Sequence, residues 1–208
     1  MPQNNKYPVT LSIDYSDKSD RLTAFFRIIL VIPILIVLGF LLGSIDGHEC
    51  GEYANESSGM IGLIFLPTLL MILFRQKYPK WWYNFNFELT KFCTRVFAYL
   101  FLLRDEYPST DEDQAVHIKL PYPNVKKDLV NWMPLVKWFL AIPHVIVLFF
   151  LWIGAVIAII IAWLAILFTG SHPKGIHDYI VSVMRWSLRV EAYAIILTTD
   201  EYPPFSLQ

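Results

Sequence analysis

The sequence predicts an all-α integral membrane protein built from two tandem parallel repeats, with short cytoplasmic β-strands. Three observations lead to this fold class. Of the 208 residues, 55% are hydrophobic and only 17% are charged, a composition typical of membrane proteins. Residues 138–168 contain no Asp, Glu, Lys or Arg. Finally, stretches of the first half of the chain recur in the same order in the second half.

The repeat is recognised by three constant offsets between matching residues. The first is 107 (116 − 9), which relates the strand at 9–13 to that at 116–120. Residues 32–38 match residues 142–148 at an offset of 110 (142 − 32), and residues 73–99 match residues 167–193 at an offset of 94 (167 − 73). The offset falls by 16 residues, which is about the length of the polar loop at 43–59. The second copy is therefore interpreted as the first copy without that loop.

The first repeat is predicted to span residues 1–108. Alternating apolar residues predict a half-buried strand at 9–13. Two apolar segments, at about 22–42 and 60–74, predict membrane helices, and Pro33 is expected to kink the first of them. The aromatic-rich segment at about 81–103 has helical periodicity and predicts an amphipathic helix at the membrane interface.

The second repeat is predicted to span residues 109–208, with a strand at 116–120 and an interfacial helix at about 175–192. One straight helix over the 31 residues 138–168 would be about 46 Å long, which exceeds the bilayer core. By analogy with the first copy, we expect two helices at about 133–152 and 154–170, joined by a tight turn. The alternative that this segment forms a hairpin which enters the membrane without crossing it is left open. Segments 99–103 and 193–198 are candidate further strands.

The distribution of charge predicts the orientation in the membrane. In this topology all 17 Lys and Arg residues fall on one side or at its interface, and the acidic loop at 43–59 has none. The positive-inside rule therefore places both termini in the cytoplasm and Cys50 and Cys93 on opposite sides. The N-terminus lacks a signal-peptide core, so the first helix is expected to direct insertion. Two copies of equal orientation imply a twofold pseudo-axis along the membrane normal.

Each interfacial helix carries one narrow polar stripe. At 100° per residue the stripe residues of the first helix fall within an arc of about 60°. They are Asn84, Glu88, Lys91 and Arg95, and their counterparts at offset 94 are Asp178, Ser182, Arg185 and Arg189.

Three interpretations of the stripe stay open. The stripe faces water and head groups from a helix that lies flat on the membrane. Alternatively, its basic residues Lys91, Arg95, Arg185 and Arg189 bind lipid phosphates or a partner protein. In the third interpretation the stripes of two transmembrane helices meet in a polar seam. The flanking positive charge disfavours the third.

Other polar residues do not assemble into a recognisable catalytic site. His48, Glu49 and Cys50 are adjacent and are interpreted as an ordinary loop rather than as metal ligands. His144 is expected to bond a neighbouring helix rather than to relay protons. The sequence has no Gly-rich phosphate loop, no Ser/His/Asp set and no paired intramembrane carboxylates. We therefore expect no enzyme, no metal and no cofactor, and a net charge of −1 argues against nucleic acid as a partner.

These observations favour a non-enzymatic scaffold or accessory subunit that binds membrane lipids or a partner complex at the cytoplasmic leaflet. A larger membrane complex and a homo-oligomer both fit this expectation. The alternative is a small channel or transporter built from two parallel repeats, because repeats and Pro-broken helices are common in transporters.

The second copy resembles a bacterial membrane family, domain-of-unknown-function family 4389. The motifs that carry the resemblance lie at residues 142–150, 162–170, 185–193 and 200–207. The first copy departs from it, because Trp81-Trp82 replaces a Gly-Ile pair and the Pro-Phe-Ser-Leu ending is missing. The resemblance implies a protein of the bacterial inner membrane, and it supplies no activity, substrate or catalytic residue.

Overall fold

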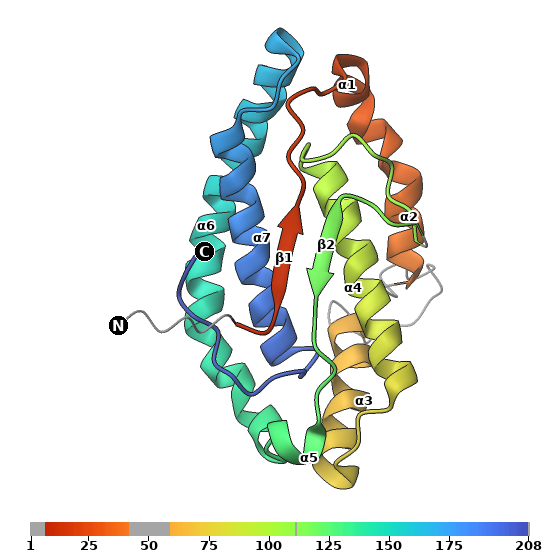
Figure 1. Ribbon diagram of the computed structural model, residues 1–208, viewed down its shortest axis with the longest axis vertical. Helices are drawn as coiled ribbons and strands as arrows, with labels where there is room; N and C mark the ends of the chain where they lie inside the picture. Colours follow the sequence, from red (N-terminus) through yellow and green to blue (C-terminus); the bar gives the residue numbers. More distant parts are fainter. Residues whose placement is uncertain (1–6, 42–58, 111, 208) are drawn as a thin grey trace, which may run out of the picture.

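The computed structural model describes residues 7–41, 59–110 and 112–207, which form a mostly helical protein with one two-stranded sheet (Figure 1). The elements of the first half are β1 (Thr10–Ile13), α1 (Arg21–Leu30), α2 (Ile32–Leu41), α3 (Gly59–Arg75) and α4 (Lys80–Leu100). Those of the second half are β2 (Val116–Lys119), α5 (Val125–Asp128), α6 (Met133–Thr169) and α7 (Lys174–Ala194).

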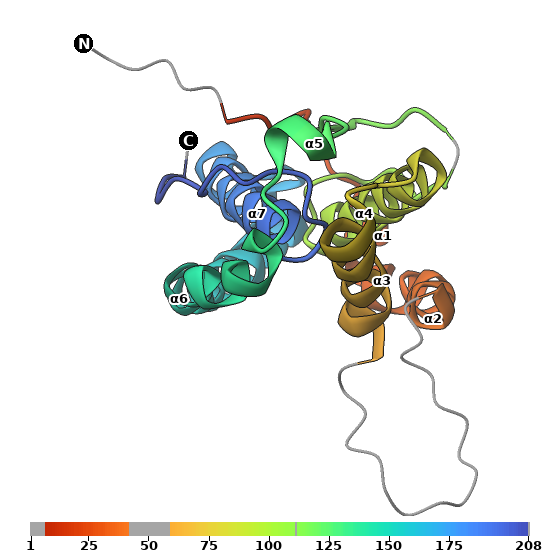
Figure 2. The same cartoon turned by 90° about the horizontal axis from the view of Figure 1, so that it is seen from below.

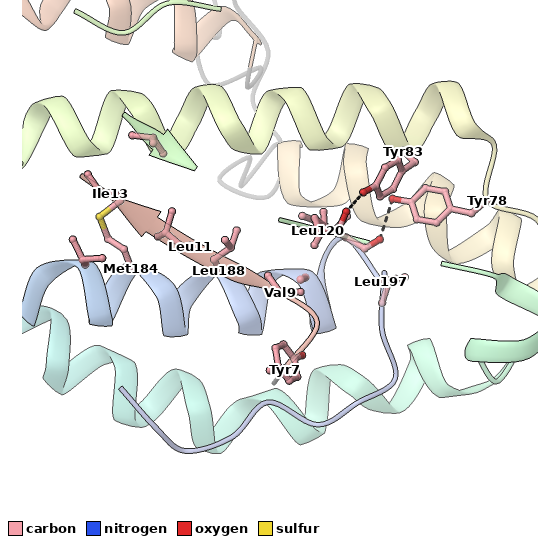
Figure 3. Close-up of a cluster of buried hydrophobic side chains, with 14 of the residues drawn as sticks. Tyr7, Val9, Leu11, Ile13, Tyr78, Tyr83, Leu120, Met184, Leu188 and Leu197 are labelled. Atoms are coloured by element: carbon pink, nitrogen blue, oxygen red, sulfur yellow. Dashed lines mark hydrogen bonds between the residues drawn. The ribbon is translucent and has the colours of Figure 1, made fainter. Parts of the chain in front are cut away.

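The two predicted strands pair with each other and form the sheet. They run antiparallel, and Leu11 lies opposite Ile118. Val9, Leu11 and Ile13 are buried, as the alternating pattern predicts. Figure 3 shows this row beside Met184 and Leu188 of α7, and the same core contains both residues. The strand β1 therefore covers one side of α7.

The helices are arranged in layers. The long helix α6 packs along α7, and it also contacts α1 and α3. Figure 2 shows α6, α3 and α2 on one side of the molecule, α5 and the C-terminal segment on the other, and α4 and α7 between them. We call α2, α3 and α6, together with α1, which contacts α2 and α6, the apolar layer.

The turn expected near residues 152–154 is wrong, because α6 is a single helix of 37 residues, about 55 Å long. Nothing in this part of α6 stops a helix, and Gly154 gives α7 room to approach closely. A Cβ atom at Gly154 would lie 2.7 Å from the hydroxyl oxygen of Tyr179. That hydroxyl donates a hydrogen bond of 2.9 Å to the carbonyl oxygen of Leu151. The α6–α7 contact therefore runs across the expected break.

The strands considered at 99–103 and 193–198 are also wrong. Helix α4 continues to Leu100 and α7 to Ala194, so helical hydrogen bonds already occupy the start of both segments. Shortly after each helix a leucine takes a left-handed conformation, Leu102 at φ 65° and Leu197 at φ 60°. Such a residue ends a helix and turns the chain.

The predicted apolar segments of the first repeat are helical. The segment at 22–42 forms α1 and α2, which meet at Val31 beside Pro33, and the segment at 60–74 forms α3. By length and composition, two helical stretches of the described residues suffice to cross a membrane, Arg21–Gly39 and Met133–Thr169. The protein is therefore mostly helical, with two candidate membrane-spanning helices.

Candidate functional site

The predicted polar stripe lies partly on the surface and partly inside the protein. Asn84, Glu88 and Asp178 are exposed, and Lys91, Ser182 and Arg185 are half-buried. Arg95 and Arg189 are buried, with exposed fractions of 3% and 7%. The eight residues therefore do not form one continuous surface.

The two buried arginines each hold a loop of the protein itself. Arg95 donates hydrogen bonds to the carbonyl oxygens of Ser109 (2.7 Å) and Glu112 (2.6 Å). Arg189 donates to the carbonyl oxygen of Ser206 at 3.3 Å, and its guanidinium lies 5.8 Å from the ring centre of Tyr7. Both side chains thus fasten the segment that follows their own helix.

The half-buried basic residues are held less tightly. Lys91 lies 3.8 Å from the carboxylate of Glu88, one helical turn away. Arg185 donates from Nε to the carbonyl oxygen of Leu11 at 2.9 Å, which ties α7 to β1. Contact of the stripe with lipid head groups stays a prediction, and Lys91 is the basic member whose contacts leave it the most freedom.

Two cations of the apolar layer, Arg27 and Lys137, are buried, and each forms an ion pair. Arg27 forms an ion pair with Asp105 and donates to the carbonyl oxygen of Tyr99 at 3.0 Å, and its guanidinium lies 4.6 Å from the centre of the Tyr99 ring. Its exposed fraction is 2%.

A similar arrangement surrounds Lys137. Its Nζ lies 2.7 Å from the carboxylate of Asp200, donates to the carbonyl oxygen of Thr199 at 2.7 Å, and lies 5.0 Å from the ring centre of Tyr193. Arg27 and Lys137 are separated by the repeat offset of 110 (137 − 27), and Tyr99 and Tyr193 by the offset of 94 (193 − 99). The aligned cations and the two Asp-Glu-Tyr-Pro segments were therefore the sequence signal for these ion pairs.

A cavity of about 370 Å³ lies between α4 and α7, beneath β1, and we call it the central cavity. Its lining includes Leu11, Cys93, Phe97, Trp152, Ser187 and Glu191. Cavities of this size are typical of small-molecule sites. Sequence reasoning did not find it, because its lining comes from β1, α4, α6 and α7.

Glu191 is the ionisable group that distinguishes the central cavity. Burial raises the pKa of its carboxyl from the usual 4.5 to about 7. Burial and the nearby Glu191 likewise raise the pKa of the Cys93 thiol to about 12, so this thiol is nearly all protonated at neutral pH. At the offset of 94 that the sequence suggested, Glu191 corresponds to Phe97 (191 − 94), so the aligned position in the first half has no carboxyl.

His144 has the hydrogen bond to a neighbouring helix that was expected of it. Trp186 of α7 donates from Nε1 to Nδ1 of His144 at 3.1 Å. The imidazole ring is fully buried and stacks on Phe205 with 4.0 Å between ring centres. His144 thus joins α6, α7 and the C-terminal segment.

His48, Glu49 and Cys50 lie outside the described residues. Among residues 7–41, 59–110 and 112–207, no three or more His, Cys, Asp or Glu side chains are grouped so that they could hold a metal ion.

Comparison with known protein families finds a match in the second half of the chain. Residues 132–206 match the model of a family described as Domain of unknown function (DUF4389). The match covers α6, α7 and the C-terminal segment, and it agrees with the resemblance of the second copy. Searches among curated proteins and among solved structures gave no match.

Proposed function

We propose that this chain, whose residues 132–206 belong to domain-of-unknown-function family 4389, is a non-enzymatic protein of the bacterial inner membrane. In this proposal it is a scaffold or accessory subunit that binds membrane lipids, or a larger membrane complex, at the cytoplasmic leaflet. It acts without a cofactor and without nucleic acid.

The observation that carries the proposal is the exposed surface of the apolar layer. On α1, Leu22 and Ile28 are about 70% exposed, and on α6, Phe139 and Phe168 exceed 70%. Further large apolar side chains are exposed along both helices and along α2. Monomeric soluble proteins rarely expose contiguous apolar patches above a few hundred Å². Lipid tails are the surroundings in which such a layer is stable.

The basic residues next to α6 bear on its orientation. Beyond its C-terminal end, Lys18 pairs with Ser171 and Lys174 begins α7. Near its N-terminal end, Lys77 and Lys80 border a hollow shared with α5. A helix crossing end to end would separate these two basic groups by the bilayer, against the positive-inside rule. The charge around α6 therefore does not support a full crossing of this helix, and the proposed orientation rests on the first repeat.

The first repeat is proposed to cross the membrane twice, with α1–α2 and α3 as its crossing helices. This keeps the protein multi-pass, with two parallel repeats and both termini and the strands in the cytoplasm. The positions aligned by the repeat support it, since Arg27 and Lys137 make corresponding contacts. The acidic loop that would connect the crossings lies outside the described residues.

Co-purification tests the scaffold proposal. Isolation in a mild detergent is expected to retain phospholipid or a stoichiometric partner protein, measured by lipid extraction and mass spectrometry. Recovery of the folded chain with neither would refute it. As a control, a soluble protein passed through the same preparation reports adventitious lipid.

The central cavity is the observation that favours the alternative, a small channel or transporter. Its lining combines Glu191 with the hydroxyl-bearing Thr90, Thr94 and Ser187. Flux into liposomes decides between the two functions. Ion or solute movement above that of empty vesicles, lost in Glu191→Gln, would favour transport over a scaffold.

A further inference from the structure

The central cavity combines apolar walls with one carboxyl group. Leu11, Met184 and Leu188 contribute aliphatic and thioether side chains, and Phe97, Phe101 and Trp152 contribute aromatic rings. Such a cavity suits the apolar body of a ligand, and its few polar groups fix the orientation. Glu191 is the one carboxyl group in the lining, and its pKa of about 7 leaves part of it charged at neutral pH.

The Glu191 side chain forms no hydrogen bond or ion pair with any residue that the structure describes. The nearest basic residues along α7 are engaged elsewhere, Arg185 with Leu11 and Arg189 with Ser206. On α4, Lys91 pairs with Glu88 and Arg95 holds the loop that follows its helix. Cys93 faces Glu191 from α4, and burial keeps its thiol protonated.

An unpaired carboxylate among apolar side chains is costly, and a cation is the group that compensates it. The aromatic rings in the same lining favour a cation as well, because ammonium groups are attracted to the faces of aromatic rings. An anionic ligand would be repelled by Glu191. A neutral ligand would leave the carboxylate without a counter-ion.

We infer that the central cavity binds an amphiphile that carries one protonated amine, with Glu191 as the counter-ion. The amphiphile enters from the bilayer, and this route rests on the proposed membrane location. The amine lies at Glu191, and the apolar body lies against Leu188 and Met184.

Binding is measured on the full chain purified in detergent, with three probes of equal chain length: dodecylamine, dodecanol and dodecanoate. We expect dodecylamine to bind best. Glu191→Gln should weaken dodecylamine about tenfold to a hundredfold, the range of a hydrogen bond to a charged group, and leave dodecanol unchanged. Glu88→Gln, at an exposed site on α4, is the matched control and should change neither. Equal binding of amine and alcohol, or no effect of Glu191→Gln, would overturn the inference.

The wild-type protein gives a second test that needs no variant. Dodecylamine affinity should rise with pH between about 5.5 and 8, because the carboxyl loses its proton there while the amine keeps its own. Affinity that does not change over this range would contradict an ion pair with Glu191. Because both tests use detergent, a protein that fails to enter membranes refutes the proposed function and leaves these binding results interpretable.

Discussion

Leu11 of β1 and Ile118 of β2 lie directly opposite each other in the antiparallel pair. In the sequence they occupy the same position of the two proposed copies, since 118 − 11 equals the strand offset of 107. The same offset aligns Thr10 with His117 and Ser12 with Lys119. In the sheet the partners are exchanged, because Thr10 opposes Lys119 and Ser12 opposes His117. This is the register that a twofold axis between two copies would produce.

The buried ion pair of Lys137 and Asp200 is expected to dominate the stability of the α6 end of the molecule. Lys137→Ala leaves Asp200 without its counter-ion, and removal of one partner from a buried pair costs about 3–5 kcal/mol. Denaturant unfolding in detergent measures this loss. Lys91→Ala, which breaks a half-exposed pair, should cost about 0–1 kcal/mol. Similar losses for the two variants would contradict the burial of Lys137.

The basic stripe residues should separate into two kinds. Arg95→Gln removes charged donors from the carbonyl oxygens of Ser109 and Glu112 and should lower the free energy of unfolding by about 1.5–3 kcal/mol. Lys91→Gln should instead weaken phospholipid retention by about 1 kcal/mol at low salt.

The salt dependence of these two effects differs. The Lys91 effect should shrink between 0.1 M and 1 M salt, as the Debye length falls from about 10 Å to about 3 Å. The Arg95 effect should persist, because its side chain is buried. If Arg95→Gln instead loses lipid retention at unchanged stability, Arg95 binds lipid head groups and does not fasten the loop.

The orientation in the membrane can be tested with a membrane-impermeant thiol reagent on intact cells. Cys50 should be labelled and Cys93 spared. The raised pKa of Cys93 makes it unreactive on either side, so its protection alone does not report topology. Asn84→Cys, an exposed site on α4, in a background that combines Cys50→Ser and Cys93→Ser should be labelled only after permeabilisation. Labelling of this cysteine in intact cells would refute a cytoplasmic α4.

Glu191 should make the stability pH-dependent. Its pKa is about 7 in the folded protein against the usual 4.5, so the folded state binds more protons than the unfolded state between these values. The free energy of unfolding should therefore fall as pH rises from about 4.5 to 7. Unfolding midpoints of wild type and Glu191→Gln across this range measure the effect. The variant should lack this part of the slope, and identical slopes would contradict the raised pKa.

The close approach at Gly154 predicts a coupled pair of substitutions. Gly154→Ala forces a Cβ atom against the Tyr179 hydroxyl and should cost about 1–3 kcal/mol, the usual range for overpacking. Tyr179→Phe removes the hydroxyl and should recover part of this loss, which a double-mutant cycle measures. Additive effects would show that the two residues do not touch.

Local pattern predicted most elements, because strand alternation and helical periodicity depend on neighbouring residues. The strand at 9–13 and the helix at 175–192 appear close to the expected bounds. The break near 152 was wrong because it was transferred from the first copy, whereas in α6 the packing of Tyr179 on Gly154 continues the helix. Helical periodicity also placed Arg95 on a polar stripe. It could not reveal that the loop after α4 covers that side chain.

The central cavity was beyond prediction for a related reason. In the sequence, Glu191 is only one more charged residue beside the polar stripe of its helix. In the structure, α4, α6 and β1 surround it. Only the arrangement of four elements in space separates it from the solvated charges of the chain.

The β1–β2 pair also bears on how such a chain could originate. A strand that pairs with its own counterpart about a twofold axis can also pair with the same strand of a second molecule. A chain with one copy would therefore form this strand pair as a homodimer. Joining two copies in one chain makes their meeting intramolecular, at an effective concentration in the millimolar range for a short flexible linker. The fused chain therefore forms the β1–β2 pair whatever its concentration in the cell. In the proposed repeat, fusion would also allow the two halves to differ, as Phe97 and Glu191 do at one aligned position.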